Sequence, residues 1–353
     1  MRVPDWTDAM KNVLIVTPLY YPAVGGASVY FKEYVVDNVS KDFNMYVLTK
    51  TFAGSRHGAV YTIPSGNTVS PVIYRIIFMW DAVAAFMYAS FLIITKRIDI
   101  VHTHTASGLC MGSSLAARVF TCTLIKDLSD TQSSRINVTF PIPDRLISLK
   151  GSCEQYARSC GIDKSLLAPT LLPFDREALR KEKLSARMRR KYFIYAGEIK
   201  RSKGIGEIVT LAKRLPSFRF ILAGPWREET IAAKLLKEHN VELLPTLNHA
   251  AVLRYIKNSL VLLQPSDSEG IPRVVIEALA LRIPVVCKKG AVWTEMFKNT
   301  PGIYLSDFSP SSFQTIVKRL GRTPIPPQQY RHFTVSKKQY RQFLMDVYTH
   351  VSE

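Results

Sequence analysis

Two glutamates, with seven residues between them, offer carboxylates within the stretch SEGIPRVVIEALALRIPVV, residues 268–286. Glu269 lies among turn-forming residues after the apolar run VLLQPS, whereas Glu277 lies in an apolar segment of good helix formers. The pattern predicts a strand, a loop, a helix whose first turn contains Pro272, and a second buried strand. The N-terminus of such a helix offers free N–H groups and a positive dipole end. The pattern therefore predicts an anion site with Glu269 beside it and Glu277 about a turn and a half inside the helix.

Glu277 also has a simpler interpretation. Arg273 lies four residues before it, so the two side chains would face each other on a helix. An exposed pair of this kind contributes only a few tenths of a kcal/mol. The sequence of this helix alone does not decide between a surface pair and a ligand contact.

Two other loops combine glycine or cations with a position between a strand and a helix. Gly25 and Gly26, in TPLYYPAVGGASVY, allow backbone N–H groups to approach a ligand closely. The segment GEIKRSKG carries Lys200, Arg201 and Lys203 just before a helix. Cations at a helix N-terminus interact unfavourably with the positive end of the helix dipole. A diphosphate bound there would explain why this loop carries three of them. An exposed basic loop is the alternative.

The elements that must position these loops alternate between strand-like and helical runs. The strand candidates of the first half are VLIVTPLYYP, MYVLT, DIVHTH, TLIKDLSD and RLISLK. Those of the second half are YFIYAGE, FRFILAG, VELLP, VLLQPS and IPVVC. Such alternation predicts the α/β class, with parallel, doubly wound sheets. We expect two Rossmann-like domains, over residues 1–172 and 173–334, and a C-terminal helix over 335–353 that packs back on the first.

Four segments follow one another along the chain: YYPAVGGAS, DIVHTHT, GEIKRSKG and PSDSEGIPRVVIEALA. In this order they resemble the motifs of the retaining glycosyltransferases of family 4 (glycosyl transferases group 1), which have the GT-B fold. The resemblance runs from about Val13 to the final helix. It implies two Rossmann-like, doubly wound domains facing each other across a cleft. It also implies hexosyl transfer from a nucleotide sugar, such as a UDP- or GDP-sugar, with retention of configuration and with no metal or other cofactor.

The resemblance assigns roles to residues of these motifs. The second domain would bind most of the donor, and the first domain would bind the acceptor. Glu277 would hydrogen-bond the ribose hydroxyls, Glu269 would contact the transferred sugar, and Lys203 would neutralise the diphosphate. The implied donor site consists of Gly25, Gly26, Arg201, Lys203, Gly270, Ile271, Pro272 and Glu277, and the catalytic candidates are Glu269, His104 and Asp130.

One departure from the family pattern weakens the expected diphosphate site. The family's usual Arg beside the glycine is Glu198 here, which places a negative charge near the diphosphate. We expect Arg201 or Lys200 to substitute for the missing Arg. The departure keeps a second function class open, which is a catalytically inert GT-B-like module that binds a nucleotide sugar or a partner.

A second departure concerns the expected imidazole. Where the family often has a His before an Asp, this chain has Ser129 before Asp130, and neither acts as an imidazole does near neutral pH. His104 is the best remaining imidazole, unless it is a strand-end histidine with a purely structural role. A sugar-nucleotide epimerase with the GT-B fold is a further alternative, which the spacing of the two glutamates disfavours.

The charge and the cysteines limit the partners and the compartment. With 47 basic and 28 acidic residues, the formal net charge of +19 predicts attraction to phosphate-rich partners. No nucleic-acid-binding motif accompanies the charge, so we expect no nucleic acid partner. Five cysteines without a C-x-x-C pair predict neither a disulfide framework nor a zinc site. With no apolar signal core near residue 1, these features predict a cytoplasmic protein.

The segment IIFMWDAVAAFMYASFLIIT, residues 76–95, is about long enough to span a bilayer and carries one charge, Asp81. Strand candidates precede and follow it, so a spanning helix would divide one sheet between two sides of a membrane. We expect a core helix or a helix with a membrane-facing surface. The basic run from Arg176 to Lys191, a solvated linker in the simpler view, adds positive charge. Together these features suit a peripheral enzyme at the cytosolic face of an anionic membrane, with a glycan or lipid-linked acceptor. An enzyme with a water-soluble acceptor is the alternative that the sequence leaves open.

Overall fold

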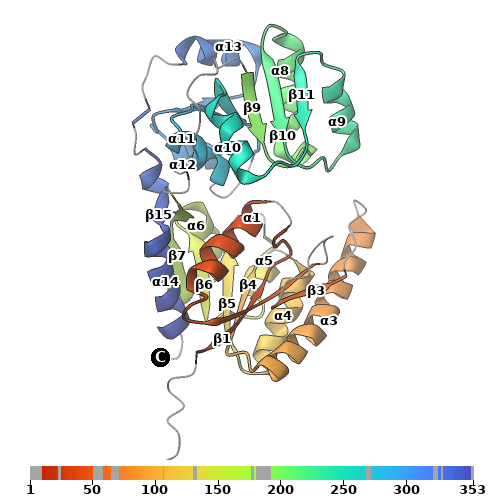
Figure 1. Ribbon diagram of the computed structural model, residues 1–353, viewed down its shortest axis with the longest axis vertical. Helices are drawn as coiled ribbons and strands as arrows, with labels where there is room; N and C mark the ends of the chain where they lie inside the picture. Colours follow the sequence, from red (N-terminus) through yellow and green to blue (C-terminus); the bar gives the residue numbers. More distant parts are fainter. Residues whose placement is uncertain are drawn as a thin grey trace, which may run out of the picture. The chain divides into compact units, whose positions relative to one another are not determined.

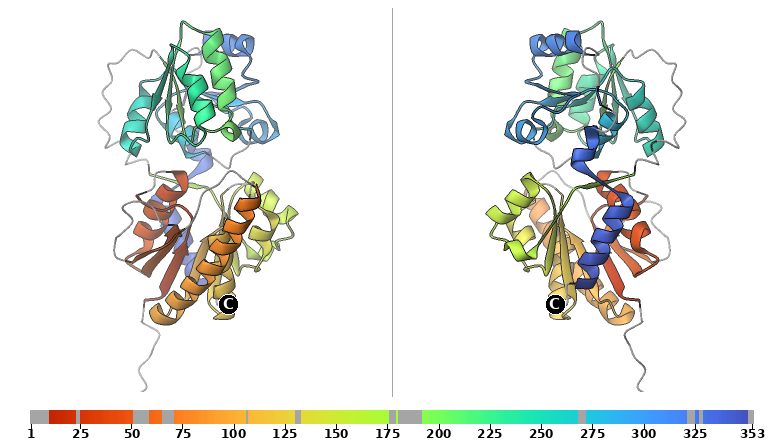
Figure 2. Two further views of the ribbon diagram at one scale, coloured as in Figure 1. Left: turned by 90° about the vertical axis from the view of Figure 1, so that its right-hand side faces the viewer. Right: turned by 90° about the vertical axis from the view of Figure 1, so that its left-hand side faces the viewer.

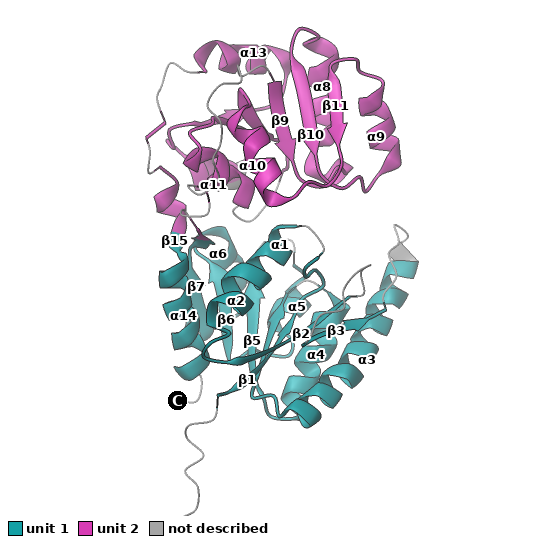
Figure 3. Ribbon diagram, in the orientation of Figure 1, with its two compact units in different colours: residues 1–173, 335–353 teal, residues 174–334 magenta. Residues whose placement is uncertain are grey.

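The computed structural model divides the chain into two compact units (Figure 3). Unit 1 comprises Met1–Pro173 and Val335–Glu353, and unit 2 comprises Phe174–Thr334. The sequence-based prediction places the boundaries after residues 172 and 334. The residues that the structure describes are 10–22, 25–50, 59–64, 71–105, 107–129, 133–175, 179, 192–267, 272–320, 325–326 and 329–350.

Parallel strands form the sheet of unit 1, in the order β3-β2-β1-β4-β5-β6-β7 (Figure 1). Helices cover both faces, so the strands are nearly continuous apolar runs, and β4 is buried along its whole length. The strand order reverses between β1 and β4. The strands are β1 (Asn12–Val16), β2 (Asn44–Lys50), β3 (Val60–Ile63), β4 (Ile100–His104), β5 (Thr123–Leu128), β6 (Arg145–Leu149) and β7 (Leu167–Thr170).

Alternate residues of β1 point to opposite faces of this sheet, as the pleat requires. Val13 and Ile15 join a core with the C-terminal helix α14, whereas Leu14 and Val16 join a core with α3 and α4 (Figure 2). The helices of unit 1 are α1 (Gly26–Val29), η2 (Tyr30–Val36), α2 (Asp37–Val39), α3 (Pro71–Lys96), α4 (Gly108–Val119), α5 (Arg135–Thr139), α6 (Ser152–Ser159), η3 (Lys164–Leu166) and α14 (Lys337–Thr349).

Helix α3 contains the apolar segment 76–95 and differs from one of the two expectations for it. Within the described residues it is the helix whose length and composition would suffice to cross a membrane. The core-helix interpretation is wrong, because only 28% of its apolar window is buried. Composition predicted an apolar helix, but it did not show that the sheet and α4 cover only one side of it.

Parallel strands also form the sheet of unit 2, in the order β11-β10-β9-β12-β13-β14. The core on one face is built from alternate strand residues such as Phe193, Phe220 and Leu263. The strands are β9 (Tyr192–Ala196), β10 (Arg219–Ala223), β11 (Val241–Leu244), β12 (Val261–Gln264), β13 (Val285–Lys288) and β14 (Ile303–Ser306). The helices are η4 (Arg201–Lys203), α8 (Ile205–Arg214), α9 (Glu229–Leu236), α10 (His249–Lys257), α11 (Arg273–Ala280), α12 (Ala291–Phe297), α13 (Pro310–Arg319) and η5 (Gln329–Phe333).

The chain passes from one unit to the other within β8 (Leu172–Phe174) and again within β15 (Thr334–Ser336), and these two strands pair. Each unit is a parallel sheet with helices on both faces, so the predicted fold class of two Rossmann-like, doubly wound domains is confirmed. Both sheets reverse their strand order beside the first strand of the unit, β1 or β9. Doubly wound sheets bind ligands at the carboxyl ends of the strands at this switch point.

Candidate functional site

The basic loop and the two-glutamate segment of unit 2 follow neighbouring strands. β9 and β12 pair in parallel, so their carboxyl ends lie at the same edge of the sheet. Gly204 ends the basic loop in a left-handed conformation, with φ of 71°, which favours glycine. A Cβ on Gly204 would also overlap the carbonyl of Pro265, which follows β12. The sequence therefore brings the two motifs into direct contact at the switch point.

Glu277 is a buried residue of α11, with 4% of its surface exposed. Its Oε1 lies 2.8 Å from Nε2 of His249, the first residue of α10. A carboxylate only accepts hydrogen bonds, so Nε2 of His249 is the donor. The exposed-pair interpretation with Arg273 is wrong, because α10 covers the carboxyl group and supplies its partner.

His249 was missed by the sequence analysis. The side chain of Asn248 accepts a hydrogen bond from the backbone N–H of Ala251, at 2.9 Å, and begins α10. This cap is a sequence feature that places His249 at the start of a helix. The pairing with a glutamate 28 residues away depends on how α10 and α11 pack, which no local pattern indicates.

Two side chains fix the segment that leads to Glu269. The indole N–H of buried Trp293 donates to the carbonyl of Ser266, at 2.7 Å. Nζ of Lys288 lies 2.9 Å from the Asp267 carboxylate and 2.6 Å from that of Glu207. The hydrogen bonds to Glu207 and Asp267 raise the pKa of Lys288 above its usual value. The chain is therefore tied to β13, α8 and α12 just before the two-glutamate loop.

The loop itself is only partly described. Glu269, Gly270 and Ile271 lie outside the described residues. Pro272 is the N-cap of α11, one residue before the helix, where the sequence predicted it within the first turn. Both positions suit proline, because neither needs a backbone N–H for the helix.

Glu198, which the sequence analysis regarded as a negative charge at the diphosphate site, is paired on both sides. Lys200 lies 2.7 Å from its Oε2 and Arg227 lies 3.2 Å from its Oε1. Burial opposes ionisation of this carboxyl, but the hydrogen bond and charge of Lys200, with those of Arg227, outweigh it and lower the pKa of Glu198. The three side chains together carry one positive charge. The expected repulsion of a diphosphate is therefore compensated.

Arg201 and Lys203 form the rest of the basic loop. Both belong to the short helix η4, and the side chain of Arg201 is exposed. The backbone N–H of Arg201 donates to Oε1 of Glu228, at 3.0 Å, which ties the loop to the start of α9. Since Lys200 is engaged by Glu198, Arg201 is the better substitute for the missing Arg.

The glycine loop of unit 1 precedes α1. A Cβ on Gly25 would crowd the side chain of Leu19, whereas one on Gly26 would meet no atom within 4 Å. Packing within this chain therefore does not require glycine at position 26. Close approach of a ligand to the backbone remains the predicted reason for it.

His104 lies at the carboxyl end of β4, beside Ser129, which follows β5. Its Nε2 lies 2.8 Å from the Ser129 hydroxyl oxygen, and 7% of the residue is exposed. The ring of Phe31 packs edge-on against it. The structure thus brings His104 together with the serine that replaces the expected histidine. Asp130, the next residue, lies outside the described residues.

A second polar cluster on the same strands was not foreseen. The hydroxyl of Tyr30 donates to the Asp127 carboxylate and is also hydrogen-bonded to the Tyr340 hydroxyl. Nδ1 of His102 lies 2.7 Å from the Tyr348 hydroxyl. Burial, followed by the charge of Asp127, raises the pKa of Tyr30 well above its usual value. The cluster anchors α14 to β4 and β5, and the alternation of His102 with another histidine in VHTH was its only sequence indication.

Unit 2 matches a known family. Residues 175–332 fit the family model for Glycosyl transferases group 1. Unit 2 is therefore similar to the group 1 glycosyltransferase domain. The match extends from β9 through α13, so the basic loop, Glu277 and His249 all lie within the matched residues. In the described part of the chain, no group of three or more His, Cys, Asp or Glu side chains is placed to hold a metal ion.

Two curated relatives match part of the chain. TuaC of Bacillus subtilis, named as a teichuronic acid biosynthesis glycosyltransferase, is 34% identical over 115 residues, which cover 32% of this chain and 28% of that protein. An uncharacterized glycosyltransferase of Haemophilus influenzae is 32% identical over 125 residues, which cover 33% of this chain and 33% of that protein. Each match therefore spans a third of the relative's length or less.

Solved structures match nearly the whole chain. A glycosyltransferase from Rickettsia africae has a TM-score of 0.72 at 11% identity, covering 98% of this chain and 99% of that one. Anabaena HepE in complex with UDP and glucose has a TM-score of 0.71 at 14% identity, covering 97% and 100%, and it has also been solved with UDP-glucose. UDP-N-acetylglucosamine 2-epimerase from Rickettsia bellii has a TM-score of 0.68 at 13% identity, covering 98% and 98%. At these identities the likeness shows the fold alone, which transferases and an epimerase share.

Proposed function

We propose that this protein is a retaining glycosyltransferase that moves a hexosyl group from a nucleotide sugar to a glycan or lipid-linked acceptor without a metal ion. The match to the group 1 domain supports the reaction class. The complexes of HepE with UDP and UDP-glucose support a nucleotide-sugar donor. Retention and metal independence are expectations from the motif resemblance. The donor site is proposed for unit 2 and the acceptor site for unit 1.

The observation that carries the proposal is that a basic loop and a buried carboxylate come from adjacent strands at the switch point of unit 2. In the proposed complex Lys203 and Arg201 neutralise the diphosphate, and Glu277 accepts hydrogen bonds from the ribose hydroxyls. A carboxylate has about four acceptor sites, of which His249 occupies one. His249 thereby holds the carboxylate in one orientation, which lowers the ordering cost of binding.

Cleavage of the glycosidic bond leaves negative charge on the nucleoside diphosphate. Cations already in place at the β9 loop stabilise that charge as it develops, without reorganisation. Glu198 does not cancel their effect, because Lys200 and Arg227 pair with it. We propose that Glu269 contacts the transferred sugar, and that His104 and Asp130 act on the acceptor side.

Product analysis of a nucleotide sugar incubated without acceptor tests this function. Panels of UDP- and GDP-sugars are followed by NMR, with Glu277→Gln as the matched control. A retaining transferase slowly releases nucleoside diphosphate together with the free sugar, initially in the donor's own anomeric configuration. An epimerase would change the sugar while it stays attached to the nucleotide. An inert module would bind a donor and leave it intact, and either result would contradict the proposal.

A further inference from the structure

Helix α3 presents a broad apolar surface that no part of the described chain covers. Trp80 and Met87 are 64% and 66% exposed, and exposed apolar side chains recur every three or four residues over the helix. At about 100° per residue, these positions occupy roughly half of the helix circumference. We call this surface the α3 face, and its central residues are Ile76, Trp80, Val83, Met87, Phe91 and Ile94.

The opposite side of α3 is fixed in place. A Cβ on Gly108 would overlap the Phe78 carbonyl, and one on Gly112 would overlap the Ala82 carbonyl. These two glycines, four apart on α4, let the two helices approach to backbone contact. The helix also joins β3 to β4 of one sheet. It therefore lies along unit 1 and cannot cross a bilayer without dividing that sheet.

The charged residues of α3 lie outside this face. Asp81 is buried on the packed side, where Nζ of Lys50 lies 2.8 Å from its carboxylate. Arg75 lies in the second turn, and Lys96, in the last turn, lies nearly opposite Trp80 around the helix. The apolar face is therefore uninterrupted by charge, and the formal net charge of +19 attracts the chain to an anionic lipid surface.

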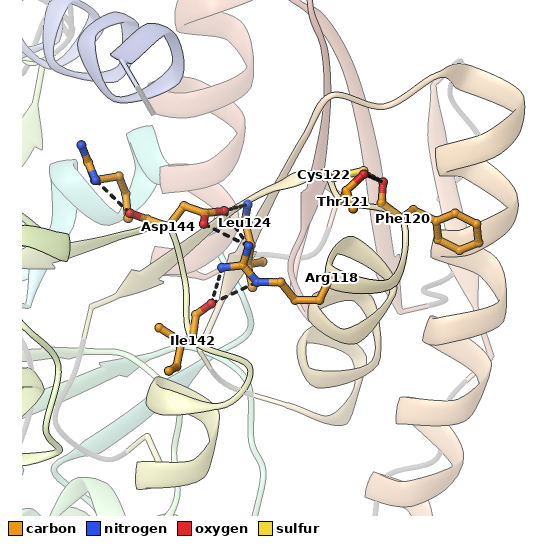
Figure 4. Close-up of polar contacts among 8 residues, drawn as sticks. Arg118, Phe120, Thr121, Cys122, Leu124, Ile142 and Asp144 are labelled. Atoms are coloured by element: carbon orange, nitrogen blue, oxygen red, sulfur yellow. Dashed lines mark hydrogen bonds and ion pairs between the residues drawn. The ribbon is translucent and has the colours of Figure 1, made fainter. Parts of the chain in front are cut away.

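The cation of neighbouring α4 is already compensated. Arg118, in its last turn, pairs with the Asp144 carboxylate at 2.9 Å and donates to the carbonyl of Ile142 (Figure 4). Val119, the next residue, is exposed. Arg118 therefore adds little uncompensated positive charge beside the apolar surface.

We propose that the α3 face is a membrane-docking surface, seated in the headgroup region of an anionic bilayer with the helix axis parallel to the membrane. Its width favours lipid over a second copy of the chain, because a two-helix seam needs only a narrow stripe. Its aromatic residues suit the same location, since Trp and Tyr gather at the membrane interface. The surface belongs to unit 1 alone and does not depend on the proposed transferase activity.

Vesicle flotation of the full chain tests the docking. Vesicles of phosphatidylcholine alone are compared with equal mixtures of phosphatidylcholine and phosphatidylglycerol, each at low and high salt. We expect binding to the anionic vesicles that is weakened but not abolished by salt, because the apolar contact is not screened. Binding lost entirely at high salt would overturn the apolar role of α3.

Paired variants locate the contact. Met87→Glu places a charge in the middle of the α3 face, whereas Leu236→Glu makes a similar change at a residue of unit 2 that is 58% exposed. We expect Met87→Glu to lower vesicle affinity about tenfold or more and Leu236→Glu to change it little. Equal affinities of the two variants would overturn the proposal. Val83→Glu repeats the test if Met87→Glu folds poorly by circular dichroism.

A fluorescence measurement distinguishes insertion from mere adsorption. Brominated lipids quench a tryptophan that reaches the acyl region, so we expect quenching in the wild-type chain that Trp80→Phe greatly reduces while vesicle binding persists. Quenching that is unchanged by Trp80→Phe would overturn insertion through α3. Sedimentation tests the rival occupant: a dimer that Met87→Glu dissociates, with no vesicle binding by the wild type, would show that a second copy covers the face.

Discussion

Replacing His249 by alanine removes the partner of a buried carboxylate. The Glu277 side chain is 5% exposed and that of His249 is 42% exposed, with 2.8 Å between Oε1 and Nε2. A hydrogen bond to a charged group contributes about 1.5–3 kcal/mol. Because His249 is partly exposed, water replaces some of this interaction in the variant. We therefore expect His249→Ala to remove about 1.5 kcal/mol of this interaction free energy, near the lower end of that range.

This loss should appear in donor binding. Without His249 the carboxylate of Glu277 is free to rotate, so binding of the nucleoside diphosphate must first order it. A loss of about 1.4 kcal/mol corresponds to roughly tenfold weaker binding. The rate at saturating donor should change much less, because the ribose contacts are the same in the ground state and the transition state.

Calorimetry with nucleoside diphosphate measures the effect, and His239→Ala, which removes an exposed histidine of the same unit, is the control. Glu277→Gln completes a double-mutant cycle. Glutamine is preferable to alanine because Glu277 is buried. If the two single effects add to within about 0.5 kcal/mol in the double variant, the two residues do not act as a unit and the reasoning is refuted.

Lys203→Ala should weaken the binding of nucleoside diphosphate more than that of nucleoside, because the proposed partner of Lys203 is phosphate. Equal losses of calorimetric affinity for the two ligands would show that Lys203 does not contact the diphosphate. Glu198→Gln should raise diphosphate affinity about two- to threefold, because it releases Lys200 and Arg227 from their pairs, and unchanged affinity would count against that role. Burial lowers the pKa of Lys126 from its usual 10.5 to about 7, while its Nζ donates to two carbonyls. Below about pH 7 the Lys126 amine is protonated in both the folded and the unfolded chain. Between about pH 7 and pH 10 it is protonated in the unfolded chain but mostly neutral in the folded chain. The free energy of unfolding should therefore rise by up to about 1.4 kcal/mol per pH unit over this range. Urea titrations of the wild type and Lys126→Met check this, and identical pH slopes would contradict it.

Much of the fold was predictable because it follows from local patterns. Parallel strands covered on both faces appear as apolar runs, as in YFIYA and VLLQ, and the glycine, proline and polar residues between them indicate loops. The family resemblance implied one donor site for the motifs after β9 and β12. The pairing of these two strands, which brings Gly204 into contact with Pro265, came only from the structure.

The partners of the site residues were not predictable, because they depend on tertiary packing. His249 reaches Glu277 from another helix, and Arg227 reaches Glu198 from a loop 29 residues away. Which side of α3 is exposed could not be predicted, for a related reason. That helix is apolar all round, so its periodicity does not show which face is covered. The structure shows the packed side, where Gly108 and Gly112 of α4 lie against the backbone of α3.

The central claim is that the Glu277 carboxylate accepts hydrogen bonds from the ribose hydroxyls of a nucleotide bound to unit 2. The most direct measurement compares calorimetric affinities of a nucleoside diphosphate and its 2′,3′-dideoxy analogue, in the wild type and in Glu277→Gln. The wild type should prefer the ribose form by about tenfold or more, because the analogue leaves the acceptor sites of the buried carboxylate that His249 does not occupy without partners. In Glu277→Gln the ratio of the two affinities should fall toward one. The same preference in both proteins would contradict the account.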